Sequence, residues 1–419
     1  MSVLAKAYVI GGGVAGLAAA TALAQRGAQV ELFEAGPQAG GRCRSYFDPA
    51  IGGVIDNGNH LVLSGNHAVY GYLQRIGAAA MLKGAPTATV DFIDLAAGLQ
   101  WRVTLNDGLI PFWILNQATR VPGTAVKDYA AYAPLVWAKK TATIGETVKT
   151  GGTLWRRLVH PYLLAALNTD PQSASAALAG SVLREGLMAG GRACRPRIAE
   201  PNLAAAFVAP ALAYLEAKGA KVHLGQRLRR FTIAGTGVRA LEFADATIPT
   251  GMKDAIVLAV NAPVAQDLVP GLTAPNEFRA IVNAHFKIAP PAGAPPILGV
   301  VGGLAEWIFT FHDRISVTIS GADAIVDEER ESLATRIWAD VAKALRLDVP
   351  LPPWQIVKEK RATFAATVAQ DALRPGPRTA TRNLILAGDW TQTGLPATLE
   401  GAVRSGDIAA RLAARHLRL

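Results

Sequence analysis

The chain has 419 residues, of which 51% are apolar and 18% are charged. This composition is typical of a globular protein and excludes a largely disordered one, and the length allows two domains or one large discontinuous domain. Neither the two cysteines, Cys43 and Cys194, nor the seven histidines show metal-ligand spacing. We therefore predict no metal site and no disulfide framework, and we expect the reducing environment of the cytoplasm.

The net charge of +10 narrows the range of partners. Basic residues occur in small groups, for example Arg227, Arg229 and Arg230. Two interpretations are open, an ordinary solvated surface or attraction to anionic lipid headgroups. We expect no nucleic-acid partner, because no known binding motif is present. We also expect no secretory signal and no membrane span, because the first strand leads into a glycine motif and no apolar run reaches about 18 residues.

The first elements in chain order lie within residues 7–36, AYVIGGGVAGLAAATALAQRGAQVELFEAG. Strand, glycine turn, helix, strand and acid form the dinucleotide-binding pattern. Gly11 makes the tight turn, Gly13 lets the backbone approach a pyrophosphate, and Gly16 lets the helix pack closely on the strand. The N-terminus of the helix offers free N–H groups to that pyrophosphate. Glu34 lies where a carboxylate accepts hydrogen bonds from ribose hydroxyls.

Two short polar segments follow, AGGRCRS and IDNGNH. Gly41 and the glycine before it allow the chain to run close to the cofactor. Arg42 can then neutralise a phosphate oxygen or lie beside the cofactor ring, and the alternative is an ordinary basic turn. Gly58 indicates a turn that brings His60 near the ring, although a lone histidine is more often structural than catalytic.

The middle of the chain contains three regions that predict different kinds of secondary structure. Residues 96–205 are predicted to form a largely helical cap, opened by a hairpin with its turn at 106–108 in GLQWRVTLNDGL. Residues 206–275 return to the nucleotide type and end in the buried strand of DAIVLAVNAP. Residues 276–375 contain the strand-forming runs PILGVVG, EWIFTF and RISVTISG, an amphipathic helix and the strand WQIVKEKRATFAA. This last region predicts a second sheet domain.

The C-terminal segment, LILAGDWTQTGLPATLEGAVRSG, is a second strand, turn and helix unit. Its strand delivers Asp389 into a cleft, where the carboxylate can hydrogen-bond the polyol that links pyrophosphate to flavin. The helix after Pro396 points its positive N-terminus at the flavin, where it stabilises the negative charge of the reduced ring. NAD has neither the polyol nor that anionic state, so we predict FAD. The predicted FAD contacts are Gly11, Gly13, Val14, Ala15, Gly16, Glu34, Ala35, Gly41, Arg42, Asn57, Gly58, Leu228, Gly388, Asp389, Ala397 and Thr398.

These elements predict an α/β fold, of the α+β two-domain flavoprotein type. A Rossmann-type FAD-binding domain is expected from residues 1–95, 206–275 and 376–419. A discontinuous substrate domain of mixed sheet plus helical cap is expected from residues 96–205 and 276–375.

The motifs GGGVAG, GGRCRS, DNGNH and LAGDWTQTGLPATLEGAVRSG together resemble those of the FAD-dependent amine oxidase and phytoene desaturase superfamily. Within it, the likeness is greatest to the hydroxysqualene dehydroxylase family, the squalene-associated FAD-dependent desaturases of hopanoid synthesis, and it runs nearly end to end. Some amine oxidases tether their flavin through a C-terminal cysteine. No cysteine follows Cys194, so the resemblance implies FAD held non-covalently.

The resemblance also implies the reaction. It is the reductive removal of the allylic hydroxyl of hydroxysqualene, a long-chain isoprenoid, to give squalene. Three alternatives stay open: carotenoid desaturation of the phytoene type, flavin amine oxidation, and a lipid carrier that has lost its flavin.

For this reaction we predict two catalytic residues. His60 is expected to protonate the leaving hydroxyl, since the unperturbed pKa of histidine near 6.5 suits an acid at neutral pH. Arg42 is expected to stabilise the reduced flavin. An apolar tunnel between the cap and the second sheet is expected to keep water away from the reacting carbon.

One segment suggests where the protein works. Residues 109–123, LIPFWILNQATRVPG, combine Phe112 and Trp113 with Arg120, as segments at membrane interfaces do, or they form an internal cap helix. We expect a cytoplasmic protein with peripheral contact to the anionic inner face of the cell membrane. The oligomeric state stays open.

Overall fold

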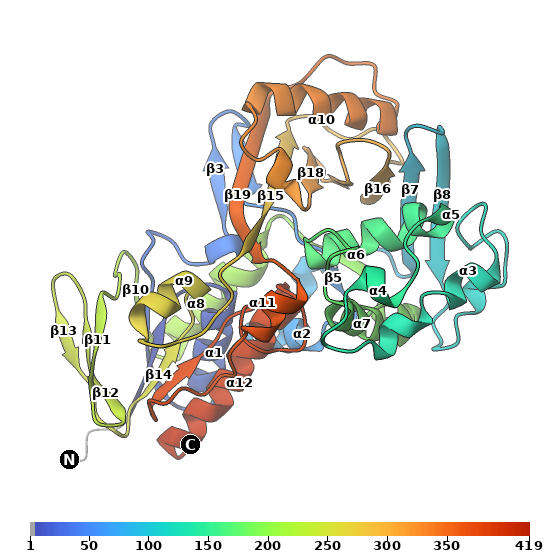
Figure 1. Ribbon diagram of the computed structural model, residues 1–419. Helices are drawn as coiled ribbons and strands as arrows, with labels where there is room; N and C mark the ends of the chain where they lie inside the picture. The colour runs from blue at the N-terminus through green and yellow to red at the C-terminus, as the bar shows by residue number, and fades with distance from the viewer. Residues whose placement is uncertain (1–4) are drawn as a thin grey trace.

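The computed structural model describes residues 5–419, which build two large sheets with helices around them (Figure 1). The first sheet has five parallel strands in the order β10-β2-β1-β14-β20. These strands span Lys221–His223, Gln29–Phe33, Lys6–Ile10, Ala255–Leu258 and Leu384–Leu386. Its central strands are continuous apolar runs, because helices cover both faces of a parallel sheet. The sheet therefore joins parts of the chain that are far apart in sequence.

Helix α1 (Val14–Gln25) follows β1, and its alanine-rich sequence is buried on all sides. A helix that is apolar all round belongs in an interior. It packs against α12 (Leu399–Leu417), where a Cβ added to Gly406 would lie 2.3 Å from the backbone oxygen of Ala15. The two helices are thus so close that only glycine fits at this crossing. Helices α2 (His67–Arg75) and α8 (Ala209–Ala217) complete this core.

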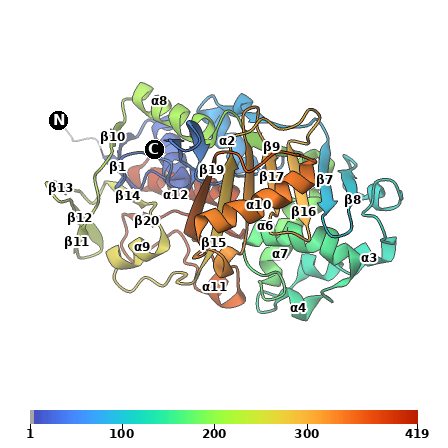
Figure 2. The same cartoon turned by 90° about the horizontal axis from the view of Figure 1, so that it is seen from above.

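The second sheet has seven strands in the order β19-β15-β18-β17-β16-β7-β8. They span Trp354–Phe364, Phe278–Phe286, Ile315–Ile319, Trp307–Thr310, Ile297–Val301, Ala88–Asp94 and Leu99–Leu105. Neighbouring strands run antiparallel except β16 and β7, which pair in parallel. Helix α10 (Arg330–Leu345) lies across one face of this sheet (Figures 1 and 2) and packs on it through Leu333, Ile337 and Val341.

The opposite face of the second sheet changes from polar to aromatic across its width. Cross-strand partners place the two sets of side chains on the same face. The polar residues, on β15 and β18, are Asn283, His285, Ser316 and Thr318. The aromatic residues, on β17, β7 and β8, are Phe92, Trp101, Trp307 and Phe309. The face therefore offers one environment for polar groups and another for hydrocarbon.

A cap of short helices covers the aromatic half. Its helices are α3 (Val126–Ala130), α4 (Ile144–Thr147), α5 (Gly152–Leu154), α6 (His160–Leu167) and α7 (Ala176–Glu185). Leu154 and Leu158 from the cap share one core with the aromatic strands.

Smaller elements connect these parts. They are the hairpin β3 (Ser45–Asp48) and β4 (Gly53–Asp56), the sheet of β5 (Val62–Leu63), β9 (Pro196–Ala199) and β6 (Leu82–Lys83), the sheet of β11 (Arg230–Ala234), β12 (Gly237–Glu242) and β13 (Thr247–Pro249), and the helices α9 (Ala262–Leu268) and α11 (Val368–Ala372).

The predicted hairpin turn at 106–108 is wrong. Strand β8 pairs with β7, the strand before it, so the hairpin turn lies at 95–98. The Asn106 side chain instead accepts from the Trp113 N–H (3.1 Å) and donates to the Ile110 oxygen (2.8 Å), which organises a loop after β8. The expected domain boundary at residue 95 consequently falls inside this hairpin.

Candidate active site

The glycine loop between β1 and α1 requires glycine at two positions. Gly11 has a φ of +106°, and its N–H donates to the Phe33 oxygen at 2.7 Å. A Cβ added to Gly16 would lie 1.9 Å from the Gly11 oxygen, so a side chain there would push α1 off the strand. A Cβ at Gly13, the N-cap residue of α1, would meet nothing within 4 Å. The loop thus has an open side at the helix N-terminus, beside Val14 and Ala15.

Glu34 follows β2 and folds back over this loop. Its Oε2 accepts the Gly12 N–H at 2.7 Å, and its Oε1 accepts the Gly36 N–H at 2.7 Å. Each carboxylate oxygen keeps a further lone pair, which suits a pair of ribose hydroxyls. Ala35 is exposed next to it. Leu228 is buried in the same core cluster as Phe33, the residue before Glu34.

The segment around Arg42 lies against the glycine loop. The Gly40 N–H donates to the Gly12 oxygen at 2.8 Å, and a Cβ added to Gly41 would lie 3.4 Å from Gly13. The Arg42 guanidinium forms an ion pair with Asp389 (2.7 Å) and donates to the Ala362 oxygen (2.5 Å). The negative charge of Asp389 raises the pKa of Arg42 above its usual value, so this group stays protonated. Residues separated by 347 positions in the chain therefore meet at one point.

The C-terminal turn carries Asp389 to this point. Gly388 has a φ of +144°, and its N–H donates to the Ser405 hydroxyl at 2.8 Å. Asp389 is buried, and Thr398, which follows Ala397, caps helix α12 by accepting the Gly401 N–H at 3.0 Å. The turn is thus anchored to the helix that follows it.

Arg374 is a structural support for this turn that the sequence analysis missed. Its buried guanidinium donates to the backbone oxygens of Asp389 (3.2 Å) and Thr391 (3.1 Å). Asp371 pairs with it at 2.9 Å. A lone arginine outside every motif gives no signal in one sequence, so only the fold identifies its role.

The segment of residues 56–60 joins the first sheet region to the polar face of the second sheet. Asn57 donates from its side chain to Glu359 at 3.2 Å, and its N–H donates to the Arg44 oxygen at 3.0 Å. A Cβ added to Gly58 would lie 2.9 Å from the Asn283 side chain, so the backbone passes close to β15. The segment ends at His60, which lies close enough to Arg42 and Asp389 for their charges to affect its pKa.

His60 does not have the pKa that the sequence analysis assumed. Burial and the positive charge of Arg42 lower its pKa to about 4, against a smaller opposite effect of Asp389. The imidazole is therefore neutral at neutral pH and can donate an N–H hydrogen bond, but it is not an imidazolium acid there.

One hollow lies beside this segment, and a second lies at the far edge of the second sheet. A small cavity, lined in part by Asn59 and His60, has room for one water-sized group. A groove of about 800 Å³ lies at the β7–β8 edge of the second sheet, and Ile198 lines both hollows. Polar residues such as Thr89 and Gln100 line the groove together with Ala344 and Leu345 of α10, so the groove lies on the α10 face of the sheet and is not the apolar tunnel predicted on the cap side.

Two features are absent from the part of the chain that the structure describes. Among residues 5–419, no helix is both long and apolar enough to cross a membrane. The same residues contain no group of three or more His, Cys, Asp or Glu side chains placed to hold a metal ion.

The fold and this site define a class of flavoenzymes. Residues 14–414 match the model of the family described as flavin containing amine oxidoreductase. Cyclohexylamine oxidase from Brevibacterium oxydans superposes with a TM-score of 0.73 at 17% identity, covering 99% of this chain and 100% of that one. A putative protoporphyrinogen oxidase from Exiguobacterium gives 0.68 at 15% identity, covering 99% of both chains. These structures confirm the predicted α/β two-domain flavoprotein fold.

Sequence relatives narrow the class. Hydroxysqualene dehydroxylase from Rhodopseudomonas palustris is 56% identical over 97% of both chains, and the one from Sinorhizobium fredii is 52% identical over 97% of both. The chain belongs to the hydroxysqualene dehydroxylase family, as its motifs predicted. A probable zeta-carotene desaturase from Synechococcus elongatus is only 23% identical over 96% of this chain and 97% of that one, which supports desaturation merely as the alternative.

Proposed function

We propose that this chain binds FAD non-covalently and catalyses the replacement of the allylic hydroxyl of hydroxysqualene by hydrogen, which yields squalene and water. The observation that carries the proposal is the identity of 47–56% to three hydroxysqualene dehydroxylases over nearly the whole chain. The bound reduced flavin supplies the hydride for this chemistry. The residues of this chain bind the cofactor, orient the substrate and exclude water.

The geometry of the site supports this proposal. The open glycine loop at Gly13 and the N-terminus of α1 suit a pyrophosphate, and Glu34 suits the adenosine ribose. Asp389 suits the ribityl chain, and its partner Arg42 supplies a fixed positive charge for a reduced, anionic flavin. The other proposed contacts are Val14, Ala15, Ala35, Gly41, Asn57, Gly58, Leu228, Gly388, Ala397 and Thr398.

His60 takes a modified role in the proposal. Because its pKa is about 4, a neutral imidazole is the form present at pH 7. We assign it the donation of an N–H hydrogen bond to the leaving oxygen, and not the delivery of a proton from an imidazolium ion.

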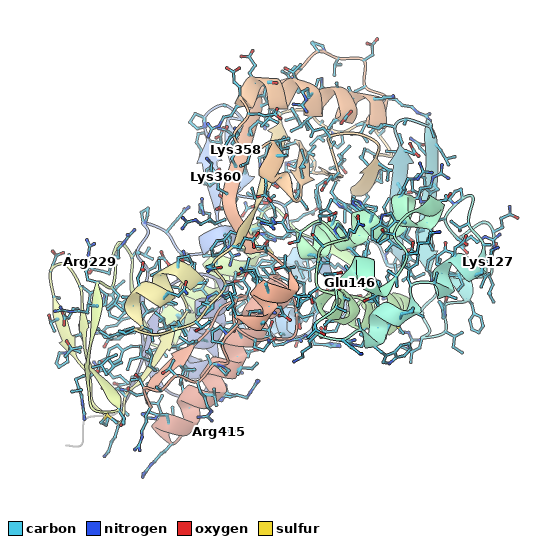
Figure 3. The ribbon with its side chains drawn as sticks, in the orientation of Figure 1. Lys127, Glu146, Arg229, Lys358, Lys360 and Arg415 are labelled. Carbon is cyan, nitrogen blue, oxygen red and sulfur yellow. The ribbon has the colours of Figure 1, made fainter. Side chains whose placement is uncertain are left out.

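An exposed apolar loop supports peripheral contact with a membrane, the compartment that holds a C30 isoprenoid. Leu109, Ile110, Phe112 and Leu115 are 74%, 63%, 58% and 59% exposed, whereas Trp113 is buried. Trp113 stacks edge-on against Tyr129 of α3, from which Lys127 projects outward (Figure 3). Apolar side chains next to a basic residue suit the headgroup region of an anionic bilayer. We therefore propose a cytoplasmic protein that docks on the inner membrane face through this loop.

The experiment is an anaerobic assay of the purified protein. Acid precipitation should release FAD into the supernatant, and the holoenzyme with reduced flavin and hydroxysqualene should form squalene, measured by gas chromatography. Failure to form squalene would refute the activity. Formation of a desaturated product from a carotenoid precursor with an electron acceptor would then assign the chain to the desaturases.

A further inference from the structure

The small cavity beside His60 has polar groups on one side and hydrocarbon on the others. Its free volume of about 10 Å³ is enough for one water-sized group. The polar side consists of Asp56, Asn59 and His60. The apolar walls are Ile198, Ala199, Leu203, Phe309 and Phe311. A single oxygen attached to a hydrocarbon chain matches this division of surfaces.

Asn59 contributes a hydrogen-bond acceptor that has no partner. The Thr318 hydroxyl donates to Asn283 Oδ1 at 2.7 Å, so its lone pair accepts the Asn59 Nδ2–H at 3.1 Å. This chain of hydrogen bonds fixes the orientation of the amide and turns Oδ1 away from Thr318. Within residues 5–419, Asn59 Oδ1 is buried and accepts no hydrogen bond. Buried polar groups without a partner are rare in proteins and commonly mark a ligand or a water.

The other two polar residues of the cavity, Asp56 and His60, differ from Asn59 in the hydrogen bonds that they make or can make. Asp56 Oδ1 already accepts the Ser45 hydroxyl at 2.6 Å and the Leu203 N–H at 2.9 Å. Those bonds join the β3–β4 hairpin to the chain before α8, which is a structural role. Neutral His60 has an N–H to donate. Asn59 and His60 therefore provide the acceptor and the donor that a hydroxyl group needs.

We infer that this cavity receives the hydroxyl of the substrate, with Asn59 Oδ1 accepting its O–H and His60 donating an N–H to its oxygen. This inference rests on the proposed function and names the groups that recognise the substrate. The C–O bond breaks, and C–H and O–H bonds form. Carbon receives a hydride, which carries the two electrons that reduced flavin would supply, and the departing hydroxyl receives a proton taken up from solvent, so that it leaves as water. The departing water is the size of the cavity.

Asn59 is on this basis the residue that distinguishes substrate from product. Squalene has no hydroxyl, so its binding leaves the amide oxygen of Asn59 unpaired. A site built to hydrogen-bond a hydroxyl discriminates strongly against an analogue that lacks it. Product release is favoured for the same reason.

The test compares the affinities of oxidised holoenzyme for hydroxysqualene and squalene. Oxidised flavin has no hydride to give, so both ligands can be titrated by the change in flavin absorbance without turnover. Wild-type enzyme should prefer hydroxysqualene by about 100-fold, the combined effect of two hydrogen bonds to buried groups that each contribute about tenfold. Asn59→Leu should cut this preference about tenfold, to the part left by the His60 hydrogen bond, and should not weaken the binding of squalene.

A second variant guards against misfolding of the first. Ala199→Leu fills the cavity from its apolar wall and should weaken hydroxysqualene to the affinity of squalene. Flavin content and the melting temperature report whether each variant folds. If folded Asn59→Leu, or Ala199→Leu where the former does not fold, keeps the wild-type preference, the inference is wrong. If wild-type enzyme forms no squalene from hydroxysqualene, the proposed function itself fails, which is a separate result.

Discussion

At the scale of single residues, Glu34 combines a structural task with its proposed ribose contact. Both of its carboxylate oxygens bind backbone N–H groups, one of them in the glycine loop. The loop conformation therefore depends on this side chain before any cofactor arrives.

Glu34→Ala is expected to weaken FAD binding by about 1–3 kcal/mol, which is roughly 5- to 150-fold in Kd. The variant loses the ribose acceptor and frees the N–H groups of Gly12 and Gly36. Fluorescence titration of the apoprotein with FAD measures the change. The control is Glu31→Ala, because Glu31 lies on the preceding strand β2 and pairs with Lys6 instead. Equal FAD affinity in the Glu34 variant and the wild type would contradict the ribose role.

His285 makes the stability of the protein depend on pH. It is fully buried, its Nδ1 lies 2.8 Å from the Ser316 hydroxyl, and burial together with Arg314 lowers its pKa to about 4. The unfolded chain has a histidine pKa near 6.5, so below that pH it takes up a proton that the folded protein does not. Stability is therefore fully present above about pH 6.5 and falls as the pH drops toward 4.

His285→Gln should remove this dependence. The wild type should lose about 2 kcal/mol from this group between pH 7.5 and pH 5, as measured by urea unfolding, and the variant should lose that much less. His312→Gln is the control, because His312 is exposed and should leave the pH dependence unchanged. A variant whose unfolding free energy declines with pH as steeply as the wild type would show that His285 is not the group responsible.

How much of the site could be predicted differs from residue to residue. Gly11, Gly13, Gly16, Glu34 and Asp389 could be proposed from the sequence because each stands at a fixed place in a strand, turn and helix pattern. The pairing of Arg42 with Asp389 and the low pKa of His60 were not predictable. Both depend on which distant residues become neighbours and on how much water they keep, and neither quantity is written in local sequence.

At the scale of elements, the crossing of α1 and α12 holds the two halves of the proposed cofactor site together. Helix α1 begins at the glycine loop and α12 begins just after the Asp389 turn. The small side chains Ala15, Ala18 and Gly406 allow the backbones to touch. The separation of α1 and α12 therefore sets the distance between the glycine loop and the Asp389 turn.

Gly406→Ala should destabilise the protein by about 1–3 kcal/mol and weaken FAD binding, because the new Cβ must push α12 away from the Ala15 oxygen. Chemical denaturation and FAD titration measure the two effects. Arg411→Ala, at an exposed position of the same helix, should change neither. An unchanged denaturation midpoint for the glycine variant would mean that the helices adjust without cost.

Most elements were predictable where the apolar period was clear. The strands β1, β2, β14, β16, β17, β18, β19 and β20 and the helices α1, α10 and α12 follow their predicted segments. Strands β7 and β15 were not predicted, because polar residues interrupt their apolar alternation; these are Thr89 and Asp91 on β7, and Asn283 and His285 on β15. The hairpin was misplaced because turn-forming residues at 106–108 also suit a loop.

At the scale of the whole molecule, the two edges of the second sheet have different surroundings. Strand β19 lies at one edge next to the β3–β4 hairpin, to which Gln355 bonds through Asp48 at 2.6 Å. Strand β8 lies at the other edge and leads into the exposed apolar loop. The apolar loop is therefore well separated from the cofactor-binding turns (Figure 1).

Replacing Phe112 and Leu115 together by serine should reduce binding to anionic vesicles by roughly 30-fold, or about 2 kcal/mol, because two apolar side chains no longer enter the bilayer. Flotation with phosphatidylglycerol vesicles at low salt measures the bound fraction. Phe47→Ser is the control, since Phe47 is 64% exposed at the opposite edge of the sheet. Wild-type protein that fails to float, or a double variant that floats equally well, would rule out docking by this loop.

The strand order of the first sheet has a consequence for how the protein is made. Strand β14 pairs with β1 on one side and with β20 on the other, and β20 is formed by Leu384–Leu386. During synthesis, β1, β2, β10 and β14 therefore leave the ribosome long before β20, the strand that completes the sheet. Until then the outer edge of β14 presents unpaired N–H and C=O groups, the template on which chains aggregate. We therefore expect the yield of soluble protein to depend on how that edge is shielded, by a chaperone or by rapid completion of the chain, before residue 386 emerges.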